Sequence, residues 1–579
     1  MADLSTSSQQ SPAAGGAVLP SAPGKAAHSD AHIKDTVESI LVAFILAFIF
    51  RGFIVEAFVI PTGSMAPTLY GAHMRLTCPD CGYTWDVGYK TGGSDDTDIR
   101  SSDSRNIRYH CPNCGYAIAE SPRIEESDLR QADQPVRFGD RILVLKYLYL
   151  FTGPTRWDVV VFKSPSPDSR KDETDPDYSM NFIKRLVGLP GESLVILDGS
   201  IFTAAGNANL EFAADGRTVL GADQFTIRRR PDYAQDRLWR VIDNNDYLPH
   251  LDRSQDPDQT PWRQPWTAGT TGGAAWQVTD DAGRPSRTFR LNNPDGADTL
   301  RFDADANPDT HAMSDWLGYD EAEHSDSGGR WRPVSVGDLK LDCFYTRVSG
   351  DGALRMQLTK RDDVFTARIT RGKVALLHGK IRQADPLLIS DESIVGSELA
   401  LPELAGGAPV HLELENVDYR VTVRVNGKAV LQTSDADYHP DVARLFTDYD
   451  NERSSPRPQV RIIGEKQSCT LEHISLSRDI YYLNHGDRNF WGSPDKIVHL
   501  GNGEYFVMGD NSFISGDARY WDKPVMLPSE GLPYVESGRV PAEFMLGKAF
   551  FVYWPAGYQP AKPVPVNLVP DFGEMRFIH

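Results

Sequence analysis

Basic residues are scarce in this sequence, and so are long apolar runs. The chain has 60 Lys and Arg against 80 Asp and Glu over its 579 residues, a formal net charge of −20, and no Lys/Arg-rich block. That balance excludes a general affinity for nucleic acid, so we predict no nucleic-acid partner. The length predicts several domains, because single hydrophobic cores stop growing beyond about 250–300 residues.

The one strongly apolar run lies near the N-terminus. Its uncharged part is only twelve residues long, which is short for a membrane span. The longer stretch 37–55 contains only two charged residues, Glu38 and Arg51, and an Arg side chain can extend its charge to the membrane–water interface. We predict one transmembrane helix at 35–58, after a disordered tail at 1–34. The lipid bilayer is then a partner. A buried core helix and a cleaved signal peptide are the alternatives, although no basic cluster precedes the run.

After this run the sequence changes to short apolar runs bounded by Gly, Pro or Asp, which is the pattern of β-strands. Within one of them, Leu194 to Thr203 has Asp198-Gly199 at its centre and predicts a β-hairpin. Because the runs come from both ends of the chain, we predict one mostly-β domain with an insertion. The runs lie at 136–150, 157–165, 180–203, 505–511 and 548–555.

The middle of the chain has a different pattern of apolar and polar residues. Between 206 and 480 apolar and polar residues alternate in segments separated by NG, RG and DG turns, which predicts a β-sandwich. The order of strands and turns resembles the concanavalin/laminin-G type of jelly roll. Residues 206–260, rich in aromatics and Arg, predict a connector packed against one of the two domains. We expect a protein or carbohydrate ligand for the sandwich, and insertion ends that lie close together, so that the insertion could be replaced by a linker.

Four of the six cysteines occur in two matching motifs, CPDCGY and CPNCGY. Two CxxC knuckles complete a tetrahedral four-thiolate zinc site, and four protein ligands leave no position for a catalytic water, so the zinc would be structural. Two disulfides are the alternative in an oxidising compartment. The long spacer between the motifs is expected to loop out, and the sequence does not decide whether Cys343 and Cys469 pair. The predicted ligands are Cys78, Cys81, Cys111 and Cys114.

Three further motifs carry the chemistry: IPTGSMAPTL (60–69), NFIKRLVGLPGE (181–192) and VMGDNSFISGDARYW (507–521). With the preceding apolar run, RFGDRILVLK and RVPAEFMLGKAFFVYWP, they resemble type I signal peptidase, a membrane-anchored serine protease with a Ser/Lys dyad. The resemblance covers 35–60, 61–75, 136–203 and 481–555. It implies a coiled, mostly antiparallel β catalytic domain on the non-cytoplasmic side of the cell membrane. It also implies cleavage of secreted precursors after small residues that end the signal peptide, with no cofactor for catalysis.

The residues support this reading on physical grounds. Ser64 is a poor nucleophile until a base removes its proton. If 181–187 is a strand, Lys184 shares a face with Phe182 and Leu186. An apolar face desolvates the ammonium group and lowers its pKa, so that a neutral amine can act as the general base.

The resemblance also implies the roles of the surrounding residues. The oxyanion hole would consist of the Ser64 backbone N–H and the Thr62 hydroxyl. Ser515 would orient Lys184, and Asp517 would pair with both Arg185 and Arg519. The loop that contains the third motif would be shaped by Asp510 and Asn511. The substrate pocket would be lined by Phe58, Ile60 and Ile183.

Two positions depart from the family pattern. Ser512 stands where the family often has Arg, and Ala518 where it often has Ser; both positions belong to the expected bracing network, and neither touches the proposed dyad. The predicted domains are a tail at 1–34, an anchor at 35–58, catalytic segments at 59–77, 121–205 and 481–579, a zinc-ribbon-like insertion at 78–120 and the sandwich with its connector at 206–480.

Three other functions compete with this one. A Ser-His-Asp triad could use His73, although nothing around it resembles a triad motif. A self-cleaving repressor of the SOS type shares a Ser/Lys core, but it would have a helix-turn-helix and no membrane anchor. A membrane-tethered binding protein with a decayed peptidase would not be expected to keep Ser64, Lys184, Ser515 and Asp517.

Overall fold

The computed structural model of the chain describes residues 28–49, 52, 54–88, 108–119, 136–165, 180–212, 219–269, 275–326, 332–382, 385–483, 490–522, 536–557 and 569–578. They divide into two units, one that ends at Val55 and one that starts at Glu56. Most of the predicted tail (1–27) and most of the spacer between the CxxC motifs (89–107) lie outside the described residues.

The first unit contains the helix α1, His28–Ile49. Its apolar side chains, among them Leu41, Phe44 and Phe48, are exposed. The helix starts upstream of the apolar run, so its first half carries charged residues such as Lys34 and Glu38. Among the described residues, no helix has the length and apolar character needed to cross a membrane. The transmembrane helix predicted at 35–58 is therefore not found.

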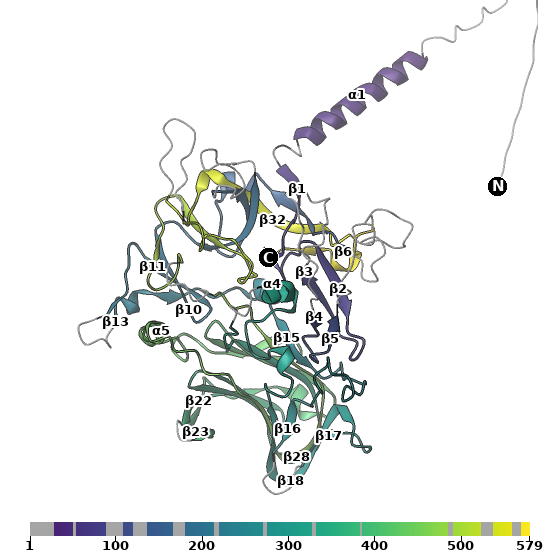
Figure 1. Cartoon of the computed structure of the whole chain (residues 1–579), viewed down its shortest axis with the longest axis vertical. Helices are drawn as coiled ribbons and strands as arrows, with labels where there is room; N and C mark the ends of the chain where they lie inside the picture. Colours follow the sequence, from purple (N-terminus) through teal and green to yellow (C-terminus); the bar gives the residue numbers. More distant parts are fainter. Residues whose placement is uncertain are drawn as a thin grey trace, which may run out of the picture. The chain divides into compact units, whose positions relative to one another are not determined.

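The second unit contains the predicted mostly-β domain. In the described part of the chain its main sheet has the order β1-β7-β32-β8-β9-β30-β31, with β33 paired to β32. In Figure 1 the yellow strand β32 lies beside blue strands, because neighbours in this sheet come from opposite ends of the chain. The bounds are β1 Val55–Val59, β7 Arg141–Leu145, β8 Val159–Lys163, β9 Asn181–Gly188, β30 Glu504–Met508, β31 Val540–Pro541, β32 Met545–Trp554 and β33 Arg576–Phe577.

The predicted hairpin at 194–203 is confirmed. The strands β10 (Glu192–Leu197) and β11 (Ser200–Ala205) pair antiparallel, with Leu194 opposite Thr203. Asp198 and Gly199 form the turn with positive φ angles of 49° and 77°, a conformation that Asp-Gly accepts readily. A four-stranded sheet is completed by β14 (Thr226–Ile227) and β29 (Val498–His499).

The inserted region forms a second large sheet around β28, a strand of nineteen residues (Val460–Arg478) that pairs with β15, β18, β19 and β20. Its core contains Trp266, Phe289, Leu341 and Phe365. The other strands are β15 Arg240–Asn244, β16 Trp266–Ala268, β17 Trp276–Thr279, β18 Pro285–Phe302, β19 Leu339–Ser349, β20 Leu354–Lys360, β21 Asp363–Thr370, β22 Lys373–Arg382, β23 Asp385–Ile394, β24 Leu399–Ala400, β25 Val410–Val417, β26 Arg420–Val425 and β27 Lys428–Gln432.

The connector at 206–260 is divided among three sheets. Its strand β15 pairs with β28 of the large sheet and β14 pairs with β11 of the four-stranded sheet, while β12 (Glu211–Phe212) and β13 (Val219–Leu220) pair with each other. The insertion also returns to its starting point: the Tyr482 amide donates to the Gly199 carbonyl at 3.3 Å. The segments that flank the insertion are thus close together; the expectation that the insertion's own ends meet stays a prediction. The remaining short elements are α2 Leu148–Phe151, α3 Asp232–Gln235, α4 Glu321–Asp326 and α5 Val442–Asp450.

The cysteine module consists of two small antiparallel pairs. The first joins β2 (His73–Thr77) to β3 (Thr84–Gly88), with β6 (Val136–Arg137) beside β2. The second joins β4 (Arg108–His110) to β5 (Ala117–Ala119). Each CxxC motif lies at the turn of its pair, which places two cysteines at each tip.

Candidate active site

Ser64 lies in a short 3₁₀ turn, η2 (Gly63–Met65), directly after the first strand of the catalytic sheet. Its side chain is buried, with 7% of the residue exposed. Lys184, on strand β9, donates from Nζ to Ser64 Oγ at 2.7 Å. The Thr62 hydroxyl approaches the same oxygen at 3.4 Å. The structure therefore brings together the predicted nucleophile and the predicted base from segments 120 residues apart.

The surroundings of Lys184 favour its neutral form. The residue is 6% exposed and its Nζ lies 5.8 Å from the centre of the Phe182 ring, on the face predicted from the strand periodicity. Burial lowers the pKa of Lys184 to about 8, with a further lowering by the Arg519 charge, while Asp517 and Asp510 act in the opposite direction. About a tenth of the amine is then unprotonated at pH 7, far more than for a free Lys, and this neutral form is what a general base requires.

The two arginines of the site each have their own carboxylate, which corrects the prediction that Asp517 pairs with both. Arg185 forms a bidentate pair with Asp510, at 2.6 and 2.7 Å. Its Nη1 also donates to the Trp157 carbonyl at 2.8 Å. Each guanidinium fork here uses both oxygens of its own carboxylate. The Asp510 carboxylate also accepts from Thr68, a residue of the first motif whose role the sequence did not reveal.

Asp517 braces the second half of the loop. It forms a bidentate pair with Arg519, at 2.8 Å for both contacts, and accepts from the Gly509 amide at 2.9 Å. Ser512, one of the two departures from the family pattern, has a use here: its hydroxyl accepts from Arg519 Nη1 at 2.7 Å and from the Leu483 amide at 2.8 Å. The other departure, Ala518, is fully buried in the catalytic core.

Ser515 does not make the hydrogen bond to Lys184 that the resemblance implied. Its Oγ is buried and has no hydrogen-bond partner among the described residues. The hydroxyl faces Gly509 instead: a Cβ at Gly509 would clash with Ser515 Oγ and with the Ser64 carbonyl oxygen. The close approach of these three backbone segments explains why glycine occupies position 509.

Asn511 contacts the nucleophile segment directly. Its backbone amide donates to the Ser64 carbonyl at 3.1 Å. Its side-chain amide donates to Asp320 Oδ1, in the inserted domain, at 2.7 Å. Asp320 was not predicted as a site residue, and no motif marks it, because only the folded chain brings it across 191 positions to Asn511.

The predicted pocket residues gather in one apolar cluster. Ile60 is buried there, and Phe58 and Ile183 pack against it while partly exposed. Phe58 and Ile60 alternate with the exposed Val59, in agreement with a shared strand face. These side chains lie beside the segments that carry Ser64 and Lys184, where they could contact a small side chain of a substrate.

His73, the base of the competing triad, faces elsewhere. It is fully buried, its Nδ1 lies 2.7 Å from the Gly71 carbonyl, and its Nε2 lies 3.7 Å from Asp86. Burial lowers its pKa, with Asp86 opposing that effect. Among the described residues, the side-chain hydrogen bonds of Ser64 Oγ go to Lys184 and Thr62.

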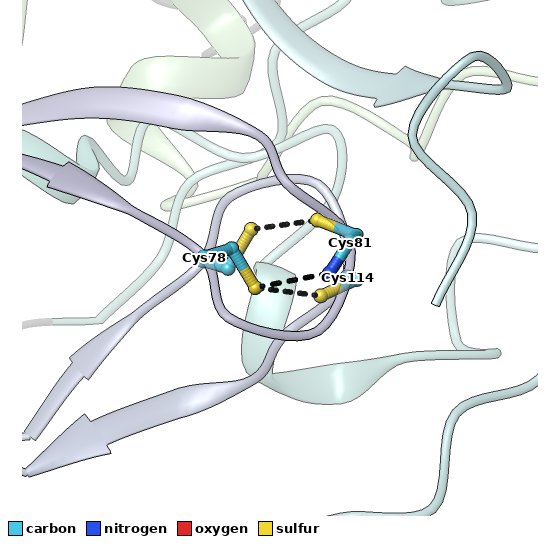
Figure 2. Close-up of side chains that lie close together, drawn as sticks. Cys78, Cys81 and Cys114 are labelled. Atoms are coloured by element: carbon cyan, nitrogen blue, oxygen red, sulfur yellow. Dashed lines mark hydrogen bonds between the residues drawn. The ribbon is translucent and has the colours of Figure 1, made fainter. Parts of the chain in front are cut away.

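The four motif cysteines form a compact cluster of free thiols, with all sulfurs within 4.8 Å of one another. Figure 2 shows the sulfurs turned toward a common centre, with Cys78 Sγ 3.7 Å from Cys114 Sγ. The Cys81 and Cys111 sulfurs are 3.6 Å apart. Four sulfurs around a tetrahedral zinc with bonds of about 2.3 Å would lie about 3.8 Å apart, so the cluster fits the ion.

Residues outside the motifs surround this cluster. Gly82 and Gly115 follow the second cysteine of each motif with positive φ angles of 79° and 71°. From the connector, Arg253 donates to Asp80 at 2.8 Å and to Cys114 Sγ at 3.0 Å. A cation beside a thiolate partly offsets the excess negative charge of a four-thiolate zinc site.

A second acidic cluster has a different character. Asp338, Asp418 and Asp479 lie within 4.8 Å of one another in the inserted domain. Lys360 Nζ lies 2.5 Å from Asp338, and Arg230 contacts both Asp418 and Asp479. The cluster therefore already contains its own counter-charges and acts as a buried ionic network.

The chain is similar to known proteins over segments that carry part of this site. The sequence model of the family described as "Signal peptidase, peptidase S26" matches residues 127–247 and 415–554, which include Lys184 and Asp517 but not Ser64. Signal peptidase I of Pseudomonas aeruginosa is 32% identical over 125 residues, which are 21% of this chain and 39% of that protein. Signal peptidase I of Leptolyngbya laminosa is 37% identical over 62 residues, 11% of this chain and 29% of that protein. The chain thus spans less than half the length of these relatives.

Two solved structures are similar to part of the chain at low sequence identity. A carbohydrate-binding module from Bacillus subtilis is 13% identical, with a TM-score of 0.22, and the match covers 37% of this chain and 99% of that module. Sheep galectin-11 in complex with glycerol is 13% identical, with a TM-score of 0.16, over 25% of this chain and 92% of that protein. TM-scores this low support no argument about ligand or function.

Proposed function

We propose, from the chain's similarity to the peptidase S26 family of signal peptidases, that it is a serine endopeptidase that removes signal peptides from exported precursors. The observation that carries the proposal is the 2.7 Å contact between Lys184 Nζ and Ser64 Oγ in a buried site. The lowered pKa of Lys184, about 8, supports the same chemistry.

The proposed reaction uses this contact as its proton path. The neutral Lys184 amine takes the proton of the Ser64 hydroxyl as Oγ attacks the scissile carbonyl carbon. The resulting ammonium then donates its proton to the departing amine when the tetrahedral intermediate collapses to an acyl-enzyme. The acyl-enzyme carries the signal peptide on Ser64. Water, activated by the same amine, then hydrolyses this ester and releases the signal peptide with a free C-terminal carboxyl group.

Two further features support transition-state and substrate binding. The Ser64 N–H and the Thr62 hydroxyl are the proposed oxyanion donors, since both belong to the segment that presents Oγ. The apolar cluster of Phe58, Ile60 and Ile183 is the proposed pocket for the small residues before the cleavage site.

We also propose that the protein is held in the cell membrane by its N-terminal apolar run, with the catalytic domain on the non-cytoplasmic side. The sequence supports this, because the apolar run 37–55 extends beyond Ile49, the last residue of α1. The lipid bilayer is the implied partner. If the anchor exists, alkaline washing leaves the protein in the membrane pellet and only detergent dissolves it; release by alkali would contradict it.

For the cysteine cluster we propose a structural zinc ion held by Cys78, Cys81, Cys111 and Cys114. The sulfur–sulfur distances and the neighbouring Arg253 support this assignment. When bound, the ion would fasten the two hairpin tips together. The absence of a nucleic-acid partner and the protein or carbohydrate ligand of the β-sandwich stay predictions.

The direct test is cleavage of an exported precursor by the purified chain in detergent, with the cleavage site determined by mass spectrometry. The wild type should produce one mature protein whose N-terminus follows a small residue. Ser64→Ala should produce none, while Ser434→Ala, an equivalent change on an exposed loop of the inserted domain, should cleave like the wild type. Equal cleavage at that site by Ser64→Ala would contradict the proposal.

A further inference from the structure

A short segment of the inserted domain lies against the nucleophile turn. It consists of the 3₁₀ turn η5 (Gly318–Asp320) and the helix α4. The buried Tyr319 ring lies against Gly63, the residue before Ser64 in the same turn, where an added Cβ would clash with it. On another side an added Cβ at Gly88, the last residue of β3, would lie 2.8 Å from the same ring.

Tyr319 thus fills a space between two modules. Its ring also packs on Tyr70, with 5.7 Å between the ring centres. Its hydroxyl is buried and has no hydrogen-bond partner among the described residues. Packing of the Tyr319 side chain, and not a hydrogen bond from its hydroxyl, is therefore what supports Gly63.

The next residue continues the contact through hydrogen bonds. Asp320 Oδ1 accepts from the side chain of Asn511 at 2.7 Å, and the backbone amide of Asn511 donates to the Ser64 carbonyl at 3.1 Å. All three residues are at least nine-tenths buried. Two hydrogen bonds thus connect the inserted domain to the backbone of the nucleophile through one asparagine.

The segment is itself held from two sides. Glu321 Oε1 lies 2.9 Å from His110 Nδ1, on strand β4 of the cysteine module. The His324 ring packs against Phe513, in the loop that carries Asn511, with 4.2 Å between the ring centres. The segment therefore touches the nucleophile turn, the 509–517 loop and the cysteine module at once.

We propose that residues 318–326 position Ser64, so that the insertion is a working part of the peptidase. Asp320 fixes Asn511, which fixes the Ser64 carbonyl, and Tyr319 fills the space behind Gly63. A displacement of about 1 Å between reacting groups costs a large factor in rate, so these contacts act on the 2.7 Å distance between Ser64 and Lys184. This inference rests on the proposed function. It also replaces the expectation that a linker could substitute for the insertion.

The test compares Asp320→Ala with Asp320→Asn in precursor cleavage by the full chain in detergent. The alanine variant loses the acceptor for Asn511, and we expect kcat to fall by about tenfold or more with KM within a factor of about two. The asparagine variant keeps an acceptor oxygen and should recover most of the rate. Asp351→Ala, the same change at an exposed position of the inserted domain, should cleave like the wild type.

A second pair of variants tests the packing. Tyr319→Phe keeps the ring and loses a hydroxyl that has no partner, so it should cleave normally. Tyr319→Ala empties the space behind Gly63 and should lower kcat. If an alanine variant does not fold, Asp320→Glu keeps the carboxyl group and shifts its oxygens by one methylene, and it should also lower kcat.

Hydrogen–deuterium exchange separates this inference from the proposed function. In Asp320→Ala, exchange should increase in peptides that contain 60–70 and 505–522, even if the wild type cleaves no precursor. Unchanged exchange there together with a wild-type kcat would overturn the inference. An unchanged melting temperature with a lowered kcat would show positioning, whereas a loss of kcat that only follows unfolding, without rescue by Asp320→Asn, would overturn it.

Discussion

The four-cysteine cluster and the Ser64 site differ in how far apart along the sequence their residues lie. The cluster takes all its sulfurs from two motifs of six residues, each folded into its own turn. The Ser64 site takes its base from β9, its bracing aspartates from the 509–517 loop and one support from the inserted domain. A site built locally can be recognised in the sequence, while a site built from distant segments depends on how whole domains pack.

That difference predicts two kinds of failure. Loss of a cysteine should disrupt the cysteine module and its metal first. In the Ser64 site, small displacements of buried backbone should stop the chemistry while most of the fold remains. The following variants separate the two cases.

The largest effect is expected for Lys184→Arg. Arginine stays charged at accessible pH and cannot accept the Ser64 proton, so cleavage should fall by about 10²–10⁴-fold, the usual contribution of a positioned general base. Precursor cleavage and circular dichroism measure activity and fold together. Lys548→Arg, on strand β32 of the same sheet, is the control. If cleavage instead survives in Lys184→Arg and is lost in His73→Ala, the triad explains the activity.

Gly509→Ala should produce the next largest effect. Its Cβ would clash with Ser515 and with the Ser64 carbonyl, so we expect a loss of about 1–3 kcal/mol in stability and of most activity. Gly516→Ala, in the same loop, has open space around its Cβ and should change neither. Thermal unfolding and cleavage assays check both variants. Equal melting temperatures for the two would show that the loop adjusts freely.

Cys114→Ser tests the local site. We expect zinc, measured by mass spectrometry of metals in the purified protein, to fall from one ion per chain to none, with increased proteolysis between 78 and 114. Cys343→Ala, at a buried cysteine outside the cluster, should keep the metal. A wild type without metal, whose four motif cysteines react with thiol reagents only after reduction, would favour disulfides.

Arg253→Lys should have the smallest effect. Lysine keeps the charge but loses the fork that contacts both Asp80 and Cys114 Sγ. We expect zinc affinity to fall about 10–100-fold, which is the usual effect of losing a residue that hydrogen-bonds to a metal ligand. Cleavage should change little. Competition with a chelator measures the affinity. Unchanged affinity would restrict Arg253 to a structural contact with Asp80.

The sequence predicts the local parts of this molecule well. The hairpin at Asp198-Gly199, the strand face shared by Lys184 and Phe182 and the cysteine cluster all follow from short-range rules of turn chemistry and periodicity. The resemblance to signal peptidases was recognisable because the motifs that carry it are short and occur in order along the chain.

The long-range parts were not predictable from the same rules. Which carboxylate Arg185 binds depends on the register of β9 against β30, so the expected pair with Asp517 was wrong and the pair with Asp510 forms. The orientation of Ser515 depends on the close approach of Gly509 to Ser64. Asp320 and Tyr319 belong to an insertion whose packing against the peptidase no local pattern records.

The pH dependence of precursor cleavage tests the central claim, that a neutral Lys184 is the base for Ser64. The deprotonated amine is the active form, so kcat/KM of the wild type should rise with pH along a single ionisation near 8 and then reach a plateau. The measurement follows initial rates in detergent from about pH 6 to about pH 10, with the folded state checked at each end. A rate that is flat through this range, or that falls as Lys184 loses its proton, would contradict the account.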